Sequence, residues 1–195
     1  MGTLLSYLSC SSCPLRSRRT RPLPTRIQAG ETLFVRKTCY LSLGSNLGDR
    51  SANLNAAIGR LASLGEIKEV SSFYETEPVD FTAQPWFLNC TVAIETELMP
   101  RQFLARLQAI EQEMGRRRTQ FKGPRPIDLD ILLFGTSIID LAELTVPHPA
   151  LHERRFVLEP LAEIAPEVRH PVFKKTMRQL RDALPSGQSV RRIPN

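Results

Sequence analysis

From residue 38 onward, hydrophobic positions alternate between the period of a strand and the period of a helix. Residues 39–44 form an apolar run that ends in Gly44-Ser45-Asn46, which is typical of a strand followed by a turn. Asp49 is of a type that caps helices, and Gly65 is of a type that ends them. Between them, apolar residues recur at helical spacing: Leu54, Ala57, Ile58, Leu61 and Leu64. The pattern predicts a strand and then a helix.

A second strand, a loop and a third strand follow. Residues 67–76 predict one continuous strand, and residues 77–85 predict a loop because two prolines keep them out of regular structure. Residues 87–94 then alternate strictly. One face carries Leu88, Cys90, Val92 and Ile94, and the other carries Phe87, Asn89, Thr91 and Ala93. We expect Cys90 to lie in the core.

A second helix and a fourth strand complete the pattern. Pro100 stands where helices tolerate proline, and Gly115 closes a stripe formed by Phe103, Leu104, Leu107, Ile110 and Met114. After a basic loop, residues 127–134 predict a strand in which one face carries Ile127, Leu129, Ile131 and Leu133. The repeated β-α-β order favours a ferredoxin-like split α/β (α+β) sandwich with a mainly antiparallel sheet. Extra C-terminal elements follow, with short helices near residues 157–164 and 177–184.

Composition and charge limit the classes of protein to consider. The chain of 195 residues is 42% hydrophobic and 24% charged, which is typical of one globular domain. No stretch approaches the roughly 20 uncharged apolar residues of a membrane-spanning helix, so we expect no membrane partner. The net charge is +6, but residues 1–37 hold seven basic residues and one acidic residue. The rest of the chain is therefore neutral, which argues against a nucleic-acid partner.

The N-terminal segment differs from the rest of the chain. Residues 1–36 are rich in Ser, Arg and Pro and have no sustained hydrophobic period, so we expect a disordered basic tail before a domain at 37–195. The tail is either an extension or a targeting segment. Its Cys10 and Cys13 have no second pair at zinc spacing. We expect a reduced, cytoplasmic protein, with organelle targeting as the open alternative.

Two carboxylates suggest a metal site. Asp128 and Asp130 project from the same face of the predicted strand, about 7 Å apart at the backbone by strand geometry. This spacing suits one or two magnesium ions, and burial without cations would be very costly.

Basic residues just before this pair suggest phosphate binding. Arg116, Arg118, Lys122 and Arg125 lie in a glycine-containing loop, and arginine forks match phosphate oxygens. Together, the acidic pair and the basic loop predict a metal and polyphosphate site. The alternative is that the arginines form a solvated helix terminus and that the aspartates flank a sheet edge. The sequence contains neither a P-loop motif nor a Gly-x-Gly-x-x-Gly motif, so the phosphates must be held in another way.

Five motifs in the same order resemble the 6-hydroxymethyl-7,8-dihydropterin pyrophosphokinase family. They are Leu43-Gly44-Ser45-Asn46-Leu47-Gly48-Asp49-Arg50, Ser72-Phe73-Tyr74-Glu75-Thr76-Glu77-Pro78, Gln84-Pro85-Trp86-Phe87-Leu88-Asn89, the Gly123-Pro124-Arg125-Pro126-Ile127-Asp128-Leu129-Asp130-Ile131-Leu132 segment, and Val146-Pro147-His148-Pro149. The resemblance spans residues 38–167. It implies transfer of diphosphate from ATP to the hydroxymethyl group of the dihydropterin, giving AMP and the pterin diphosphate in folate biosynthesis.

The resemblance also implies roles for individual residues. Asp128 and Asp130 would bind two magnesium ions, and Arg116 and Arg125 would stabilise charge during transfer. The nucleotide would be contacted by Gln108, Glu111, Arg118, Lys122, His148 and Arg154, with Arg118 and Arg154 in mobile loops. Without the resemblance, Gln108 and Glu111 would be interpreted as ordinary polar positions on an exposed helix face.

The pterin would lie between aromatic rings with an amide at its edge. The resemblance assigns the rings to Phe87 and Phe156, the amide to Asn89, and the edge to Thr76 and Val79. Taken alone, both phenylalanines would be interpreted as core residues.

Two other functions and one departure from the family stay open. A ferredoxin-like domain with basic loops could bind RNA, although the neutral body and the aspartate pair argue against it. A degenerate homologue could bind pterin without catalysis. The order Phe121 then Lys122 also departs from the family pattern, which leaves the adenine contacts open. We expect a monomer whose partners are ATP and a dihydropterin.

Overall fold

The computed structural model describes residues 35–79, 83–116, 123–185 and 187–194. Of the expected basic tail, residues 1–34 lie outside the described residues, and these include Cys10 and Cys13. Arg118, Phe121 and Lys122 also lie outside them. Among the residues described, no helix is both long and apolar enough to cross a membrane.

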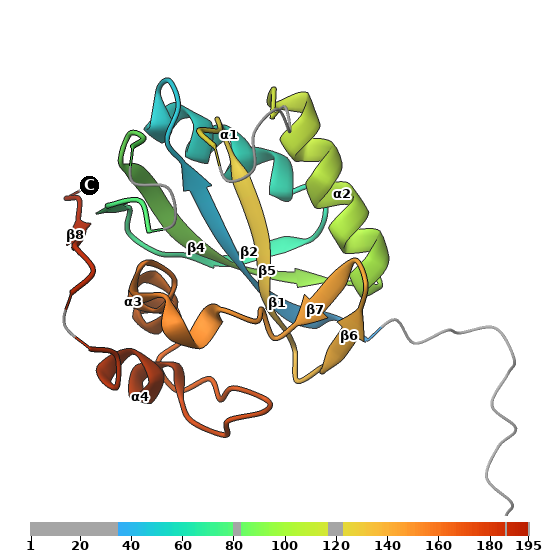
Figure 1. Ribbon diagram of the computed structural model, residues 1–195. Helices are drawn as coiled ribbons and strands as arrows, with labels where there is room; N and C mark the ends of the chain where they lie inside the picture. Colours follow the sequence, from blue (N-terminus) through green and yellow to red (C-terminus); the bar gives the residue numbers. More distant parts are fainter. Residues whose placement is uncertain (1–34, 80–82, 117–122, 186, 195) are drawn as a thin grey trace, which may run out of the picture. The chain divides into compact units, whose positions relative to one another are not determined.

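A six-stranded sheet forms the centre of the described domain. Its strands run in the order β5-β1-β4-β3-β8, with β2 also pairing to β4, and all pairs are antiparallel (Figure 1). The strands are β1 (Lys37–Ser45), β2 (Glu66–Val70), β3 (Tyr74–Thr76), β4 (Phe87–Thr96), β5 (Asp128–Phe134) and β8 (Val190–Arg192). The predicted ferredoxin-like, mainly antiparallel α/β fold is confirmed.

Helices α1 (Arg50–Leu61) and α2 (Pro100–Glu113) cover one face of the sheet (Figure 1). The predicted cap is confirmed, because the Asp49 carboxylate accepts a 2.9 Å hydrogen bond from the Ala52 N–H. The apolar stripes of both helices pack against the strands and form the first core cluster, which includes Leu54, Leu61, Phe103, Leu107, Leu41, Leu43 and Cys90.

The other face of the sheet is covered by α3 (Arg155–Ile164) and α4 (Met177–Asp182) (Figure 1). A short 3-10 turn, Leu151–Glu153, precedes α3, and strands β6 (Ile139–Leu141) and β7 (Leu144–Val146) form a separate hairpin. The second core cluster includes Leu132, Leu133, Leu151, Val157, Leu158, Leu161, Met177 and Leu180. Since both faces are covered, β4 is buried along most of its length, and Cys90 is in the core as predicted.

Two details of the predicted strands are wrong. Residues 67–76 are two strands, β2 and β3, with a break at residues 71–73. At the break, the Ser71 hydroxyl accepts a hydrogen bond from the Thr91 N–H at 2.9 Å, so a side chain replaces part of the backbone ladder. Leu133 does not share a face with Leu129, since Leu129 packs in the first core cluster and Leu133 in the second. The cause is a register shift between β1 and β5 next to Tyr40, which reverses the side-chain alternation of β5.

Candidate active site

A pocket opens where the ends of β1, β4 and β5 meet the start of α3. The space within it, together with the open solvent at its mouth, is about 700 Å³. Its lining comprises Ser42, Gly44, Thr76, Glu77, Pro78, Val79, Gln84, Phe87, Asn89, Arg125, Asp128, Asp130, Arg154 and Phe156.

The fold brings nine of the predicted site residues into this one pocket. They are Thr76, Val79, Phe87, Asn89, Arg125, Asp128, Asp130, Arg154 and Phe156. Gln108, Glu111 and Arg116 line a second hollow, and His148 lines a third. Arg118 and Lys122 lie outside the described residues.

The acidic pair is flanked by two arginines. Asp128 forms an ion pair with each of them. The Arg116 guanidinium lies 2.5 Å from one carboxylate oxygen, and the Arg125 guanidinium lies 2.5 Å from the other. Asp130 lies one pleat further along β5. Burial, reinforced by the charges of Asp128 and Glu111, raises the pKa of the Asp130 carboxyl to about 7. An ionised Asp130 is therefore disfavoured at this position unless a cation lies beside it.

This donor set fits a divalent cation shared with a phosphate ligand. Within the described ranges, no group of three or more His, Cys, Asp or Glu side chains forms a complete metal site. Magnesium commonly takes one or two carboxylates from the protein and the remaining oxygens from substrate phosphates and water. Asp128 and Asp130 supply that number of carboxylates in a pocket that also contains arginines.

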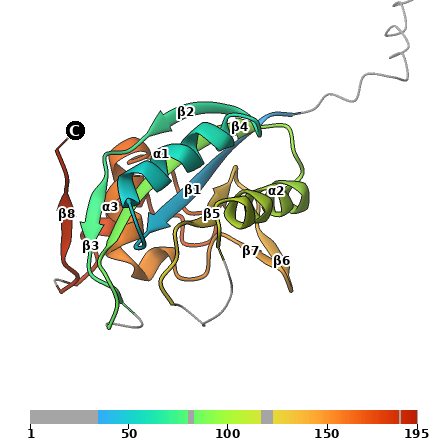
Figure 2. The same ribbon diagram turned by 90° about the horizontal axis from the view of Figure 1, so that it is seen from above.

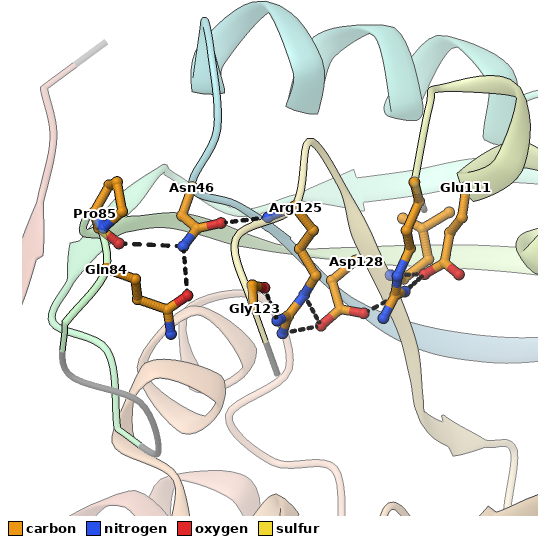
Figure 3. Close-up of polar contacts among 9 residues, drawn as sticks. Asn46, Gln84, Pro85, Glu111, Gly123, Arg125 and Asp128 are labelled. Atoms are coloured by element: carbon orange, nitrogen blue, oxygen red, sulfur yellow. Dashed lines mark hydrogen bonds and ion pairs between the residues drawn. The ribbon is translucent and has the colours of Figure 1, made fainter. Parts of the chain in front are cut away.

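Glu111 is buried rather than exposed on its helix. The side chain is within the interior, and one oxygen accepts a 2.7 Å hydrogen bond from the Leu129 N–H and pairs with Arg116 (Figure 3). Burial raises the pKa of its carboxyl. Glu111 thus fixes Arg116 between itself and Asp128, and the interpretation as ordinary surface polarity is wrong for this residue.

Contacts among the residues of the pocket fix the Asn89 amide and cover the two phenylalanine rings. The Asn89 side-chain N–H₂ donates to the Thr76 hydroxyl at 2.7 Å, which sets the orientation of the amide. A Cβ at Gly44 would lie 2.7 Å from the Asn89 Oδ1, so the adjacent strand needs glycine there. The Arg125 and Arg154 guanidinium groups lie over the rings of Phe87 and Phe156, at 5.1 and 5.6 Å from the ring centroids.

Asn46 joins three segments around the pocket. The sequence analysis did not predict this role. Its side chain is 2% exposed and donates to the Gln84 Oε1 at 3.0 Å and to the Pro85 carbonyl at 3.3 Å. The Asn46 Oδ1 accepts a 2.8 Å hydrogen bond from the Arg125 N–H (Figure 3). The position of Arg125 therefore depends on the turn that follows β1.

His148 follows β7 and is held by its backbone and by its ring. The His148 N–H donates to the Leu132 carbonyl at 3.0 Å, and the ring Nδ1 accepts from the Ala150 N–H at 3.2 Å. Burial, together with the charge of Arg154, lowers the pKa of His148 to about 4. The imidazole is therefore neutral at pH 7, with its Nε2 left as the N–H donor.

Comparison with known proteins identifies the same family as the sequence motifs. The family model described as 7,8-dihydro-6-hydroxymethylpterin-pyrophosphokinase (HPPK) matches residues 40–166. A 2-amino-4-hydroxy-6-hydroxymethyldihydropteridine pyrophosphokinase from Aquifex aeolicus is 40% identical over 144 residues, which cover 74% of this chain and 90% of that protein.

Longer proteins match as well. The folic acid synthesis protein fol1 of Schizosaccharomyces pombe is 44% identical over 157 residues, which cover 80% of this chain and only 21% of that protein. This chain thus spans about a fifth of that relative. In the fold comparison, a crystal structure of Plasmodium falciparum HPPK-DHPS with pteroate has a TM-score of 0.62 at 18% identity, covering 76% of this chain and 44% of that chain.

Proposed function

The chain belongs to the 7,8-dihydro-6-hydroxymethylpterin-pyrophosphokinase family, and we propose that it transfers diphosphate from ATP to the hydroxymethyl group of 6-hydroxymethyl-7,8-dihydropterin. The products are AMP and the pterin diphosphate, an intermediate of folate biosynthesis. One observation carries the proposal. A single pocket is lined by two carboxylates, two arginines, two aromatic rings and an amide whose orientation is fixed.

At the polar end, Asp128 and Asp130 would hold two magnesium ions. Bound there, the ions would neutralise phosphate charge and orient the diphosphate. Arg116 and Arg125, which pair with Asp128, would turn to the phosphates and stabilise the charge that develops during transfer. Further nucleotide contacts would come from Gln108, Glu111, Arg118, Lys122, His148 and Arg154.

At the apolar end, the pterin would lie between the rings of Phe87 and Phe156. The Asn89 amide, oriented by Thr76, would read the polar edge of the heterocycle, and Val79 would line the same side. In this pose the hydroxymethyl group would face Asp128 and Asp130, which line the same pocket.

The transfer requires positioning more than covalent chemistry. The hydroxymethyl oxygen attacks the β-phosphorus in line, the bond between the α-phosphate bridging oxygen and the β-phosphorus breaks, and AMP leaves with that oxygen. The pterin hydroxyl releases its proton to the solvent. The arginines and the aromatic rings would orient the two substrates.

The test is to incubate the protein with ATP, magnesium and the dihydropterin and to separate the nucleotide products. The proposal predicts AMP that depends on the pterin and is lost in Asp130→Ala. ADP in place of AMP would identify an ordinary kinase. Tight pterin binding without any nucleotide product would identify a degenerate homologue, and either result would contradict the proposal.

A further inference from the structure

Strand β8 joins the two walls of the pocket that would hold the pterin. β8 pairs with β3, with Val190 opposite Thr76 and Arg191 opposite Glu75 (Figure 2). The residues just before β8 are Gln188 and Ser189. Each of them makes a hydrogen bond to a different wall of the pocket.

The first wall is the start of α3, which carries Arg154 and Phe156. The first N–H groups of a helix have no partner inside the helix and need an external acceptor. Among the residues described, the N-cap Arg154 makes no side-chain capping hydrogen bond. Instead, the Gln188 Oε1 accepts a 2.8 Å hydrogen bond from the Arg155 N–H, across 33 residues of sequence. Gln188 therefore caps the helix end that presents Phe156.

The second wall is the segment 76–79. The Ser189 N–H donates to the Glu77 Oε1 at 2.9 Å, and the Ser189 carbonyl accepts a 3.4 Å hydrogen bond from the Glu77 N–H. Glu77 and its neighbours Pro78 and Val79 line the pocket. Two consecutive residues thus connect the Phe156 wall to the Thr76–Val79 wall.

A salt-bridge chain extends the same connection to the residue before β4. Arg191 pairs with Glu75 at 2.5 Å, and Glu75 pairs with Arg50 at 2.9 Å. The Arg50 guanidinium in turn donates to the Trp86 carbonyl at 2.9 Å, next to Phe87. β8 is consequently tied to the segments of both aromatic rings.

We propose that Gln188 is a positioning residue for the pterin, which fixes the Phe156 wall relative to the Thr76–Val79 wall through β8. The inference rests on the proposed function of the pocket. Gln188 is not among the described residues that line the pocket. Its effect on pterin binding would therefore pass through α3 and not through contact with the substrate.

The test compares Gln188→Leu with Gln188→Glu, because glutamate keeps an oxygen acceptor for the Arg155 N–H and leucine does not. A neutral hydrogen bond corresponds to about a fivefold change in an equilibrium constant. We expect Gln188→Leu to raise the KM for the dihydropterin about three- to tenfold, with the KM for ATP and kcat within twofold. Gln188→Glu should restore the KM for the dihydropterin. Gln188→Asn, a milder change that withdraws the acceptor by one methylene, should raise it in the same direction.

Gln179→Leu is the matched control. The Gln179 Oε1 accepts a 2.9 Å hydrogen bond from the Thr176 N–H at the start of α4, so this variant also removes a glutamine cap from a helix. It should lower the thermal unfolding midpoint without changing the KM for the dihydropterin.

Three results would overturn the role of Gln188: an unchanged pterin KM in Gln188→Leu, an equal shift of both substrate KM values, or an equal shift in Gln179→Leu. Wild-type protein that forms no pterin-dependent AMP would instead refute the proposed function, and this inference with it.

Discussion

Replacing Asn46 by alanine should disrupt the pocket from a position outside its lining. The Asn46 side chain makes three hydrogen bonds, to Gln84, to the Pro85 carbonyl and to the Arg125 N–H. Alanine removes all three and leaves the partly buried main-chain N–H of Arg125 without its acceptor. Arg125 also pairs with Asp128, so its displacement reaches the acidic pair.

The size of the effect follows from these contacts. Each of the three lost hydrogen bonds contributes about 1 kcal/mol, so we expect the free energy of unfolding to fall by about 3 kcal/mol. A displacement of about 1 Å at a charge-stabilising arginine can cost about 100-fold in turnover, so kcat should fall by at least about tenfold. Urea unfolding and the rate of AMP formation measure the two quantities.

Asn46→Asp separates the two sets of contacts. Aspartate keeps an acceptor for the Arg125 N–H but turns its second oxygen toward the Gln84 Oε1 and the Pro85 carbonyl. We expect this variant to retain more kcat than Asn46→Ala and to have a raised KM for the pterin, since Gln84 lines the pocket. Asn55→Ala, on the exposed side of α1, is the matched control. Wild-type stability within about 0.5 kcal/mol and wild-type turnover in Asn46→Ala would refute this reasoning.

Three further predictions concern the pocket and its surroundings. Asp130→Ala should reduce kcat by at least about a thousandfold, without a loss of stability in magnesium-free buffer, because the wild-type carboxylate is buried at a cost; comparable turnover would contradict the metal assignment. Gly44→Ala should raise the KM for the pterin about tenfold, because the new Cβ displaces the Asn89 amide; an unchanged KM would show that the amide does not contact the pterin. His148→Asn keeps an acceptor for the Ala150 N–H but cannot titrate. As the pH falls from 7 to 5, wild-type protein should lose about 2 kcal/mol of stability relative to this variant, because the imidazole gains a proton in the unfolded state and stays neutral in the folded state. A stability difference that is independent of pH would contradict the lowered pKa.

The sequence was sufficient for the elements whose hydrophobic pattern is long and regular. β1, β4, β5, α1 and α2 were predicted because each buries a stripe or a face of the expected period. The short strands β6, β7 and β8 were not, since three residues carry no period. β8 is recognisable as a strand from its pairing with β3, which no local pattern encodes.

The missed parts of the site depend on contacts between distant segments. The Glu111 carboxylate accepts from the Leu129 N–H, 18 residues later, and the Asn46 amide contacts residues 84, 85 and 125. No local spacing encodes these pairs. Gly44 was predicted only as the end of a strand, although it faces Asn89 across the sheet at register position Gly44↔Asn89. The aspartate pair on β5, in contrast, was evident from a strict two-residue alternation in an otherwise apolar strand.

The most direct test of the account follows the phosphorus atoms of ATP. Parallel reactions with ATP labelled at the α-, β- or γ-phosphorus are run with the dihydropterin and magnesium, and the pterin product is separated from the nucleotide. The account predicts that the β and γ labels move together into the pterin product and that the α label stays in AMP. Transfer of the γ label alone, with the β label retained in ADP, would contradict diphosphate transfer.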